Sequence, residues 1–443
     1  MKYIVALFCM IVSLSVSEVF ARDWYVSAER GKGKKGTIEK PARDLSFILR
    51  RLEPGDVVHI AEGTYLSKNE AGVDEINVPV SIIGGYSNDF SKRDPWGEHR
   101  TVLTGINPGG GWAQGPRLYI KLGKYRGEEH PKITIDGLII DQGPMNRYKT
   151  DKRQQIVRKG GGGMKPTPDL SAVIIGLGKP SKVGATPSEI EFKNNIIINS
   201  ASSQGSVKLY SFKGGKVTVT NNVILNQTGP GLALGSNTAA YRPDSPTFEV
   251  TNNTIAFSWL YDELTTTRPA SAVWIEEYVK VSMRDNVFTM ADTDTIEFKG
   301  RSDNEEFFLD LRNNIISMGK KSDYRETNMG TAARIEDLED EAELLSYDSE
   351  GNESLNIVLP VSQEWAELYA ARVLVDRAAV EQNIKPAAGW QNDLRGMLGL
   401  NLQAGNIGEV GGAIWLPQLP LDDAIAVAVG GPYEGRGAGT PGF

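Results

Sequence analysis

The stretch IEFKNNIII at residues 190–198 decides the fold, because nearly the same phrase returns four more times before residue 320. Each copy reads apolar, polar, apolar, polar, then a pair that is Asn-Asn or Asp-Asn, then a second and mostly apolar run. The other copies are VTVTNNVIL (217–225), FEVTNNTIA (248–256), VSMRDNVFT (281–289) and LDLRNNIIS (309–317), with a weaker copy, ITIDGLIID (133–141), upstream.

The spacing of the copies indicates a solenoid. They begin 27, 31, 33 and 28 residues apart, as expected when loops of variable size join recurring strands and each coil contacts only its neighbours. The alternation within each copy predicts a strand with one face turned inward. Asn accepts left-handed backbone geometry better than other non-glycine residues, and its amide can bond to nearby backbone or stack on the next coil. The Asn pairs are therefore interpreted as structural corners and not as catalytic residues.

A second set of phrases carries a family resemblance. EPGDVVHIAEGTY (53–65), followed by a strand, GGY (84–86), SKRDP (91–95) and TVLTG (101–105), resembles the amino-terminal end of the secreted pectate-lyase-like superfamily. With the Asn phrases, the resemblance covers residues 22–325 and implies an all-β solenoid, a right-handed parallel β-helix. The chain lacks the WIDH-like and RxPxxR motifs of pectate and pectin lyases and the GHG motif of polygalacturonases. Their catalytic residues therefore cannot be carried over.

The first 21 residues predict a signal peptide. They contain Lys2, an apolar core and the small-residue cleavage pattern Val19-Phe20-Ala21. The apolar core is shorter than the roughly 20 residues that a spanning helix needs, so no transmembrane segment is expected after cleavage. The only cysteine, Cys9, lies in this leader. We therefore expect an extracytoplasmic protein, secreted or periplasmic, whose mature chain has no disulfide.

Both ends of the solenoid are expected to be capped. Within ARDLSFILRRLEPGD (42–56), leucine and isoleucine recur at helical spacing, which predicts an N-terminal capping helix. Residues 326–443 are interpreted as a partly helical C-terminal cap and tail, because SQEWAELYAARVLVDRAAVEQN (362–383) is amphipathic. The later AIAVAVGG (424–431) resembles a strand. A solenoid needs such capped ends to remain soluble.

Charge suggests the class of partner. The whole chain has 48 Lys and Arg against 56 Asp and Glu, a net charge of −8, which argues against nucleic acid. Residues 142–170 instead form a basic loop with a run of four glycines. This loop favours a polysaccharide partner of acidic type.

Six further strands between the corners predict a candidate site. They are RLYIKLG (117–123), AVIIG (172–176), VKLYS (207–211), GLALG (231–235), AVWIE (272–276) and TIEFKG (295–300). With their apolar residues inward, the others form two outward columns spaced about 4.8 Å per strand. The columns are Lys208, Ala233, Trp274, Glu297 and Tyr210, Gly235, Glu276, Lys299. Small residues in the middle predict an exposed recess, and the 257–271 loop is expected to bring Trp259, Tyr261, Asp262 and Arg268 beside it.

Such a face suits an extended glycan, with Trp259, Tyr261, Trp274, Arg268 and Lys299 as substrate-binding residues. For β-elimination at a uronate, a base removes the proton next to the carboxylate and a cation neutralises the developing charge. The candidate bases are Lys208 and Tyr210, and the candidate cations are Arg268, Lys299 and a calcium ion held by Asp262 and Glu276.

For hydrolysis, two carboxylates flank the bond, and Glu276 with Glu297 is the available pair. The basic loop tips the preference toward a lyase for an acidic, uronate glycan, with a glycoside hydrolase second. Two alternatives stay open from the sequence. The face can be a solvated sheet on which Lys and Glu of adjacent strands pair, and the protein can be a non-catalytic scaffold that binds glycan or another surface. Apart from calcium, no cofactor motif is present.

Overall fold

The computed structural model describes residues 21–70, 72–106, 116–122, 125, 131–145, 171–176, 189–202, 204–211, 214–236, 245–259, 270–276, 279–299, 308–327, 330–337, 347–374, 390–400 and 418–442. The predictions of a signal peptide and a basic loop fall mainly on residues 1–20 and 146–170, outside this set.

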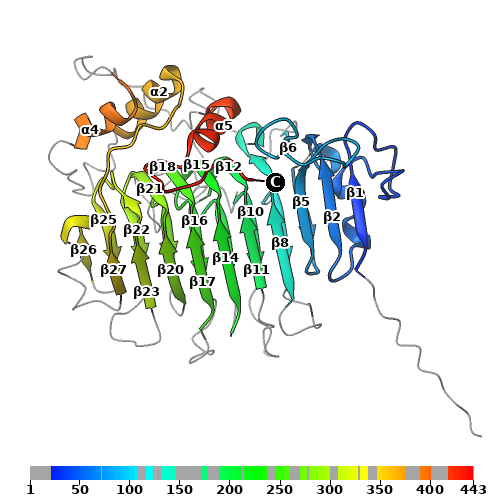
Figure 1. Ribbon diagram of the computed structural model, residues 1–443, viewed down its shortest axis with the longest axis horizontal. Helices are drawn as coiled ribbons and strands as arrows, with labels where there is room; N and C mark the ends of the chain where they lie inside the picture. Colours follow the sequence, from blue (N-terminus) through cyan, green and yellow to red (C-terminus); the bar gives the residue numbers. More distant parts are fainter. Residues whose placement is uncertain are drawn as a thin grey trace, which may run out of the picture.

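Three long sheets run along the molecule (Figure 1). Sheet A contains β1 (Asp23–Val26), β2 (Val57–Ala61), β5 (Ser81–Tyr86), β8 (Lys132–Asp136), β11 (Glu189–Lys193), β14 (Lys216–Thr220), β17 (Thr247–Thr251), β20 (Lys280–Arg284), β23 (Phe308–Arg312) and β27 (Tyr347–Glu350). Sheet B contains β3 (Gly63–Tyr65), β6 (Thr101–Leu103), β9 (Ile139–Asp141), β12 (Ile196–Ala201), β15 (Val223–Thr228), β18 (Thr254–Trp259), β21 (Val287–Ala291) and β24 (Ile315–Ile316). Sheet C contains β4 (Asp74–Ile76), β7 (Leu118–Lys121), β10 (Val173–Gly176), β13 (Val207–Tyr210), β16 (Leu232–Gly235), β19 (Val273–Ile275), β22 (Asp294–Phe298), β25 (Ser322–Glu326) and β26 (Thr331–Ala333).

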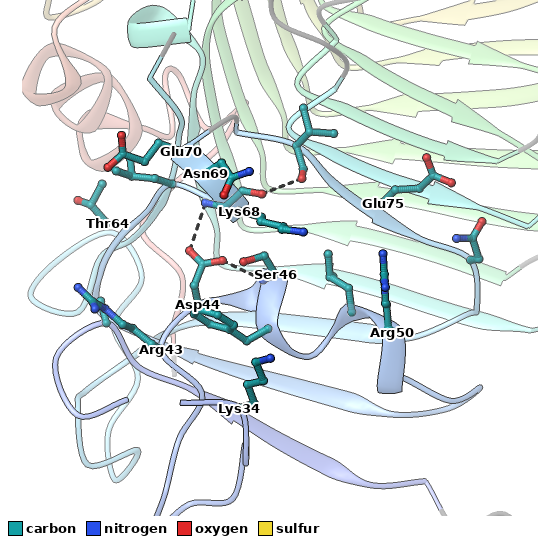
Figure 2. A pocket seen from close by; sticks show the side chains of 17 residues that line it. Lys34, Arg43, Asp44, Ser46, Arg50, Thr64, Lys68, Asn69, Glu70 and Glu75 are labelled. Atoms are coloured by element: carbon teal, nitrogen blue, oxygen red, sulfur yellow. Dashed lines mark hydrogen bonds between the residues drawn. The ribbon is translucent and has the colours of Figure 1, made fainter. Parts of the chain in front are cut away.

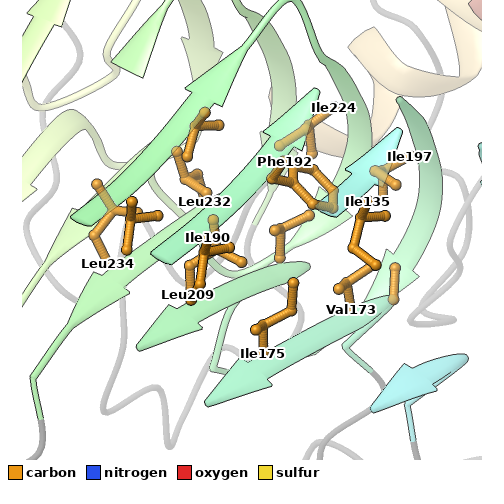
Figure 3. Packing of buried hydrophobic residues seen from close by; sticks show 14 of the residues in the cluster. Ile135, Val173, Ile175, Ile190, Phe192, Ile197, Leu209, Ile224, Leu232 and Leu234 are labelled. Atoms are coloured by element: carbon orange, nitrogen blue, oxygen red, sulfur yellow. The ribbon is translucent and has the colours of Figure 1, made fainter. Parts of the chain in front are cut away.

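Neighbours within each sheet are one coil apart in the chain, and all pair in parallel except β25 with β26. The chain is therefore an all-β parallel β-helix, as the sequence predicts. The five Asn phrases stack in register: Ile190 pairs with Val217, Val217 with Phe248, and so on to Leu309. Their apolar side chains fill one continuous interior together with those of sheets B and C (Figure 3).

The two asparagines of each corner have different roles. The first has the left-handed conformation, with φ of 55° at Asn194 and 56° at Asn221. The second is buried and forms a ladder: the Asn222 side-chain amide donates to Asn253 Oδ1 at 2.9 Å, and Asn253 donates to Asn286 Oδ1 at 3.0 Å. Each inner amide also donates to a backbone carbonyl, such as Phe192 O for Asn222 at 2.9 Å. The structural interpretation of the corners is confirmed.

Two further corners use glycine in the left-handed position. In the weak upstream copy, Gly137 has φ 70° and Leu138 takes the place of the inner Asn. Downstream, YDSEGN at residues 347–352 is a copy that the sequence analysis missed, with Gly351 at φ 65° and Asn352 accepting from Asn314 at 2.8 Å. Parallel pairing in sheet A thus continues through β27.

The outer face of sheet B is covered by the C-terminal region. Helices α2 (Gln363–Leu374), α4 (Trp390–Met397) and α5 (Leu421–Gly430) lie along the side of the solenoid (Figure 1). Trp365 and Tyr369 pack edge-on against Phe257, with ring centroids 4.8 and 5.1 Å away. Strands β12, β15, β18 and β21 are therefore buried on both faces, which explains the nearly continuous apolar run in these repeats. None of the helices within the described ranges is long and apolar enough to cross a membrane.

The stretch AIAVAVGG is the end of helix α5, so its assignment as a strand is wrong. Ala424, Ile425, Val427 and Ala428 are buried, and the helix contacts β12 and β15. A helix needs apolar side chains on one side only, and the buried residues of this run supply that side. Asp422 and Asp423 lie in the first turn, where negative charge is favourable.

The chain end then crosses the corners of successive coils. Gly437 N donates to Asp285 O at 2.7 Å, Ala438 N to Thr254 Oγ1 at 3.0 Å, and Gly439 N to Asn221 Oδ1 at 2.9 Å. We call residues 436–439 the strap. Each step of the strap moves one coil toward the amino-terminal end.

The N-terminal capping helix is not a regular α-helix. The segment forms two 3-10 turns, η1 (Leu45–Phe47) and η2 (Leu49–Arg51), joined at Ile48, whose φ of −112° breaks regular geometry. Asp44 caps the first turn by accepting from Ser46 N at 2.8 Å. Leu45, Ile48 and Leu52 are still buried, so the apolar stripe was identified correctly although the helix type was wrong. Other 3-10 turns within the described ranges are η3 (Lys68–Glu70), η4 (Gly143–Met145) and η6 (Ile335–Asp337).

Candidate functional site

The six strands predicted to carry the site all belong to sheet C. Lys208 pairs with Ala233, Ala233 with Trp274, and Trp274 with Glu297, so the first column exists as predicted. The second column continues beyond β19, because Glu276 N donates to Leu234 O and Lys299 N donates to Ile275 O, both at 2.8 Å. The inward partners of both columns, such as Val207 and Leu209, are fully buried in the interior.

The predicted exposure of this face is wrong. Lys208 is 6% exposed, Tyr210 7%, Trp274 5% and Glu297 5%, whereas Glu276 and Lys299 are half-buried. Alternation correctly gives the side of the sheet on which a side chain lies, but it says nothing about what packs there. The open edge of the face is therefore at Glu276, and the first column is enclosed.

Tyr210 fills the recess that was expected above Gly235. A Cβ built on Gly235 would lie 2.5 Å from the Tyr210 ring and 3.3 Å from the Glu276 carboxyl carbon. The ring thus passes over the strand that lies between, and its hydroxyl donates to Glu276 Oε1 at 3.0 Å. The glycine is needed for this close approach, and the space that a small residue leaves is occupied by the protein itself.

Lys208 is held within the same cluster. Its Nζ donates to Gln204 Oε1 at 2.7 Å and lies 5.7 Å from the centre of the Tyr210 ring. The ammonium therefore has an amide acceptor and an aromatic face beside it. Gln204 lies in the turn before β13, where strand alternation assigns no side, so the sequence analysis missed it.

Glu297 is the electrostatically unusual member. Burial, reinforced by the nearby charge of Asp294, raises the pKa of its carboxyl to about 7, although a 2.6 Å hydrogen bond from Thr327 Oγ1 works in the opposite direction. The carboxyl is therefore partly protonated near neutral pH. Thr327 follows β25 and was not identified from the sequence.

Buried carboxyls continue toward the carboxy-terminal coil. Burial raises the pKa of Asp294, which accepts from Ser322 Oγ at 2.5 Å. Burial also raises the pKa of Asp323 to about 6, against the opposing charge of Arg334. In the sequence, these buried carboxyls are visible only as an acidic residue within each apolar strand. An acidic residue that caps the end of a strand gives the same pattern.

The loop residues assigned to the site have other positions. Trp259 ends β18 in sheet B, is fully buried, and donates from Nε1 to Asn226 Oδ1 at 3.1 Å, so it does not face sheet C. The substrate-binding role predicted for it is corrected on that ground.

Tyr261, Asp262 and Arg268 lie outside the described residues. In the part of the chain that the structure describes, no group of three or more His, Cys, Asp or Glu side chains is arranged to hold a metal. Without Asp262, the calcium hypothesis stays a prediction.

Comparisons with known proteins give distant likenesses. No protein-family model and no curated protein matches the sequence. Among solved structures, the native GH136 lacto-N-biosidase from Eubacterium ramulus has 12% identity and a TM-score of 0.36, and the match covers 75% of this chain and 68% of that chain. Its selenomethionine derivative has 11% identity, the same coverages and a TM-score of 0.35. XylC in complex with xylose has 12% identity and a TM-score of 0.33, with coverages of 76% and 68%. Such weak likenesses carry no argument about the site, and the fold rests on the three sheets themselves.

Proposed function

We propose that this β-helix is a glycan-acting enzyme whose active site is the outward face of sheet C, and that Glu276 and Glu297 hydrolyse a glycosidic bond. The observation that carries the proposal is the diagonal placement of the two glutamates on adjacent strands, because Glu297 is opposite Trp274 in the ladder. Diagonal neighbours in a sheet are about 7–8 Å apart. This is a backbone spacing, and side chains at such diagonal positions can reach the roughly 6.5–9.5 Å that separates the carboxyls of inverting glycosidases.

The two carboxyls have environments that suit different roles. Glu297, with its pKa raised to about 7, is the proton donor to the leaving oxygen. Glu276 is half-buried and held by the Tyr210 hydroxyl, so it is the base that activates water at the open edge of the face. Trp274 lies between the two glutamates in the columns and, being buried, packs beside them.

Elimination at a uronate is the second candidate, favoured by Lys208 beside the Tyr210 ring on the same face and by the composition of the basic loop. Tyr210 is less suited to be its base, because its hydroxyl already donates to Glu276 and a phenolate would face that carboxylate. Lys208 is the remaining base for this reaction. We also propose that the protein is exported, on the strength of residues 1–21 alone.

The test is a screen of the purified protein against neutral and uronate polysaccharides. Newly formed reducing ends without absorbance of unsaturated products would support hydrolysis, and such absorbance would support elimination. Glu297→Gln and Glu276→Gln should each lower hydrolysis by about 10²–10⁴-fold. Glu249→Gln, a change at a half-exposed glutamate on sheet A, is the matched control and should retain activity. If neither product forms while a glycan still binds, the non-catalytic scaffold replaces the enzyme.

A further inference from the structure

A cavity of about 950 Å³ lies at the amino-terminal end of the solenoid, away from the two glutamates (Figure 2). It is bounded by the 3-10 turns η1 and η2 on one side and by the segment that leads into β4 on the other. Its volume is at the upper end of the roughly 300–1,000 Å³ of typical ligand sites. Its charged and aromatic lining residues are Lys34, Arg43, Asp44, Phe47, Arg50, Lys68, Glu70 and Glu75.

The positively charged side chains of the cavity have no bonding partner within the described residues. Lys34, Arg43, Arg50 and Lys68 are exposed, and within the described residues none of these side chains has a hydrogen bond or ion pair. The carboxylate of Asp44, in contrast, is already used, since it accepts from Ser46 N at 2.8 Å and Ser67 N at 3.2 Å. The cavity is therefore lined by four positively charged side chains whose donors are free and by only two free carboxylates, those of Glu70 and Glu75. Such donors favour an anionic ligand.

An aromatic ring lies among these cations. Phe47 is 42% exposed, although most large apolar side chains of the chain are buried. It lines the cavity together with Leu49, Leu66 and Val73. A simple inorganic anion gains nothing from an apolar surface, whereas a sugar ring stacks on it. The combination therefore fits an anionic group carried on a sugar.

The cavity wall has an unusual backbone that its neighbours hold in place. Ser67, Asn69 and Glu70 have φ of 64°, 55° and 61°, a conformation that costs non-glycine residues free energy and must be held by the surroundings. Ser67 Oγ donates to Val73 O at 2.7 Å and to Asp74 Oδ1 at 2.9 Å. Asp74 in turn forms a fully buried ion pair with Arg117, at 2.5 Å. The wall is thus shaped before any ligand arrives.

The cavity also aligns with the columns of sheet C. Glu75 lies in β4 and pairs with Tyr119, and the same register leads through Ile174 to Lys208. Six strand spacings of about 4.8 Å, roughly 29 Å in all, separate β4 from β22. A ligand in the cavity therefore lies on the same face as the glutamates but does not contact them.

We infer that this cavity is a separate binding site for an anionic saccharide, whose carboxylate or sulfate groups bond to Arg43, Arg50 and Lys68 while a sugar ring stacks on Phe47. The inference does not depend on catalysis at sheet C. Binding here holds one end of an anionic chain and leaves the rest free to extend along the sheet.

The experiment measures binding of tetragalacturonate and of a heparin tetrasaccharide by titration calorimetry, with neutral galactotetraose for comparison. The two anionic probes separate carboxylate from sulfate recognition. The variant Arg43→Gln with Arg50→Gln should lower affinity for the preferred probe at least tenfold. Lys32→Gln with Lys35→Gln removes the same charge from exposed residues of the same region that do not line the cavity, and should change affinity less than twofold.

Phe47→Ala distinguishes a saccharide from a bare anion. It should weaken tetrasaccharide binding about fivefold or more and leave inorganic sulfate binding unchanged. Glu249→Gln, a change at a half-exposed glutamate on sheet A, should bind the tetrasaccharide like the parent. Equal losses of affinity in the two double variants would show general charge attraction and contradict a specific site. Equal affinity for the neutral probe would contradict an anionic ligand. Unchanged melting curves verify that each variant is folded.

Discussion

The inner Asn ladder and the outward face of sheet C both hold buried polar side chains in columns along the solenoid, but they are built differently. In the ladder, Asn222, Asn253 and Asn286 repeat the same residue and the same two bonds at every coil. In sheet C the residue changes at every coil, and two members of the first column, Lys208 and Glu297, are ionisable. The repeated Asn gives backbone groups at each corner their hydrogen-bond partners. A column whose residue type changes at each coil does not serve that structural purpose.

The difference is also electrostatic. An amide has no charge to lose on burial, so the ladder costs little once every donor and acceptor is matched. Glu297 accepts a hydrogen bond from Thr327, but burial outweighs that bond and raises the pKa of its carboxyl. A cost of this kind is typical of sites that carry chemistry. The comparison therefore supports a structural role for the ladder and a functional one for sheet C, and three experiments test it.

The largest effect is expected in the ladder. Asn253→Leu removes the bonds from Asn253 to Val219 O and Asn286, and leaves Asn222 N and Nδ2 without their acceptor. With about 1–3 kcal/mol for each buried group left unsatisfied, the free energy of unfolding should fall by about 3–5 kcal/mol in denaturant titrations. The neighbouring Asn252→Gly keeps the left-handed corner and should cost less than about 1 kcal/mol. Equal losses would mean that the two positions do not differ as described.

The second effect is a pH dependence of stability from Glu297. Its pKa is about 7 in the folded protein against 4.5 for a free glutamate, so between these values the folded state binds more protons than the unfolded state. Stability should therefore fall as pH rises from about 4.5 to 7, by about 3 kcal/mol from this group. Glu297→Gln should remove that part of the fall, and Glu249→Gln should keep it. An identical pH profile for both variants would contradict the buried, protonated carboxyl.

The smallest effect tests how tightly the face is packed. Gly235→Ala places a methyl group against the Tyr210 ring and should cost about 1–3 kcal/mol. Adding Tyr210→Ser should recover part of that loss, because the two changes share one contact. Gly33→Ala, where nothing lies within 4 Å, is the control and should be nearly neutral. Simple additivity of Gly235→Ala and Tyr210→Ser would show that the ring does not lie over the glycine.

The sequence was sufficient for the fold because each repeat contains its own strand pattern and corner, and Ile190 to Leu309 stack as their alignment implies. It failed where geometry depends on distant partners. The segment around Ile48 has the spacing of a helix but forms two turns. Trp259 was placed in a loop because nothing local marks the C-terminal helices that bury it. Likewise Glu297 was identified by alternation, while its raised pKa depends on burial by parts of the chain that are distant in sequence, against the opposing hydrogen bond from Thr327, thirty residues later.

The strap gives the solenoid a property that stacked repeats lack. In a linear array, each coil is stabilised by its nearest neighbours, so an end can unravel while the middle stays folded. Here Gly437, Ala438 and Gly439 fasten three successive coils to one short peptide. Unfolding of one coil therefore also releases the bonds between the strap and the neighbouring coils. The unfolding transition becomes more nearly all-or-none. These bonds join residues as far as 218 positions apart, so they cannot form until the strap itself has been synthesised. The strap thus makes the coils that it joins more cooperative, through contacts of long sequence separation that form slowly.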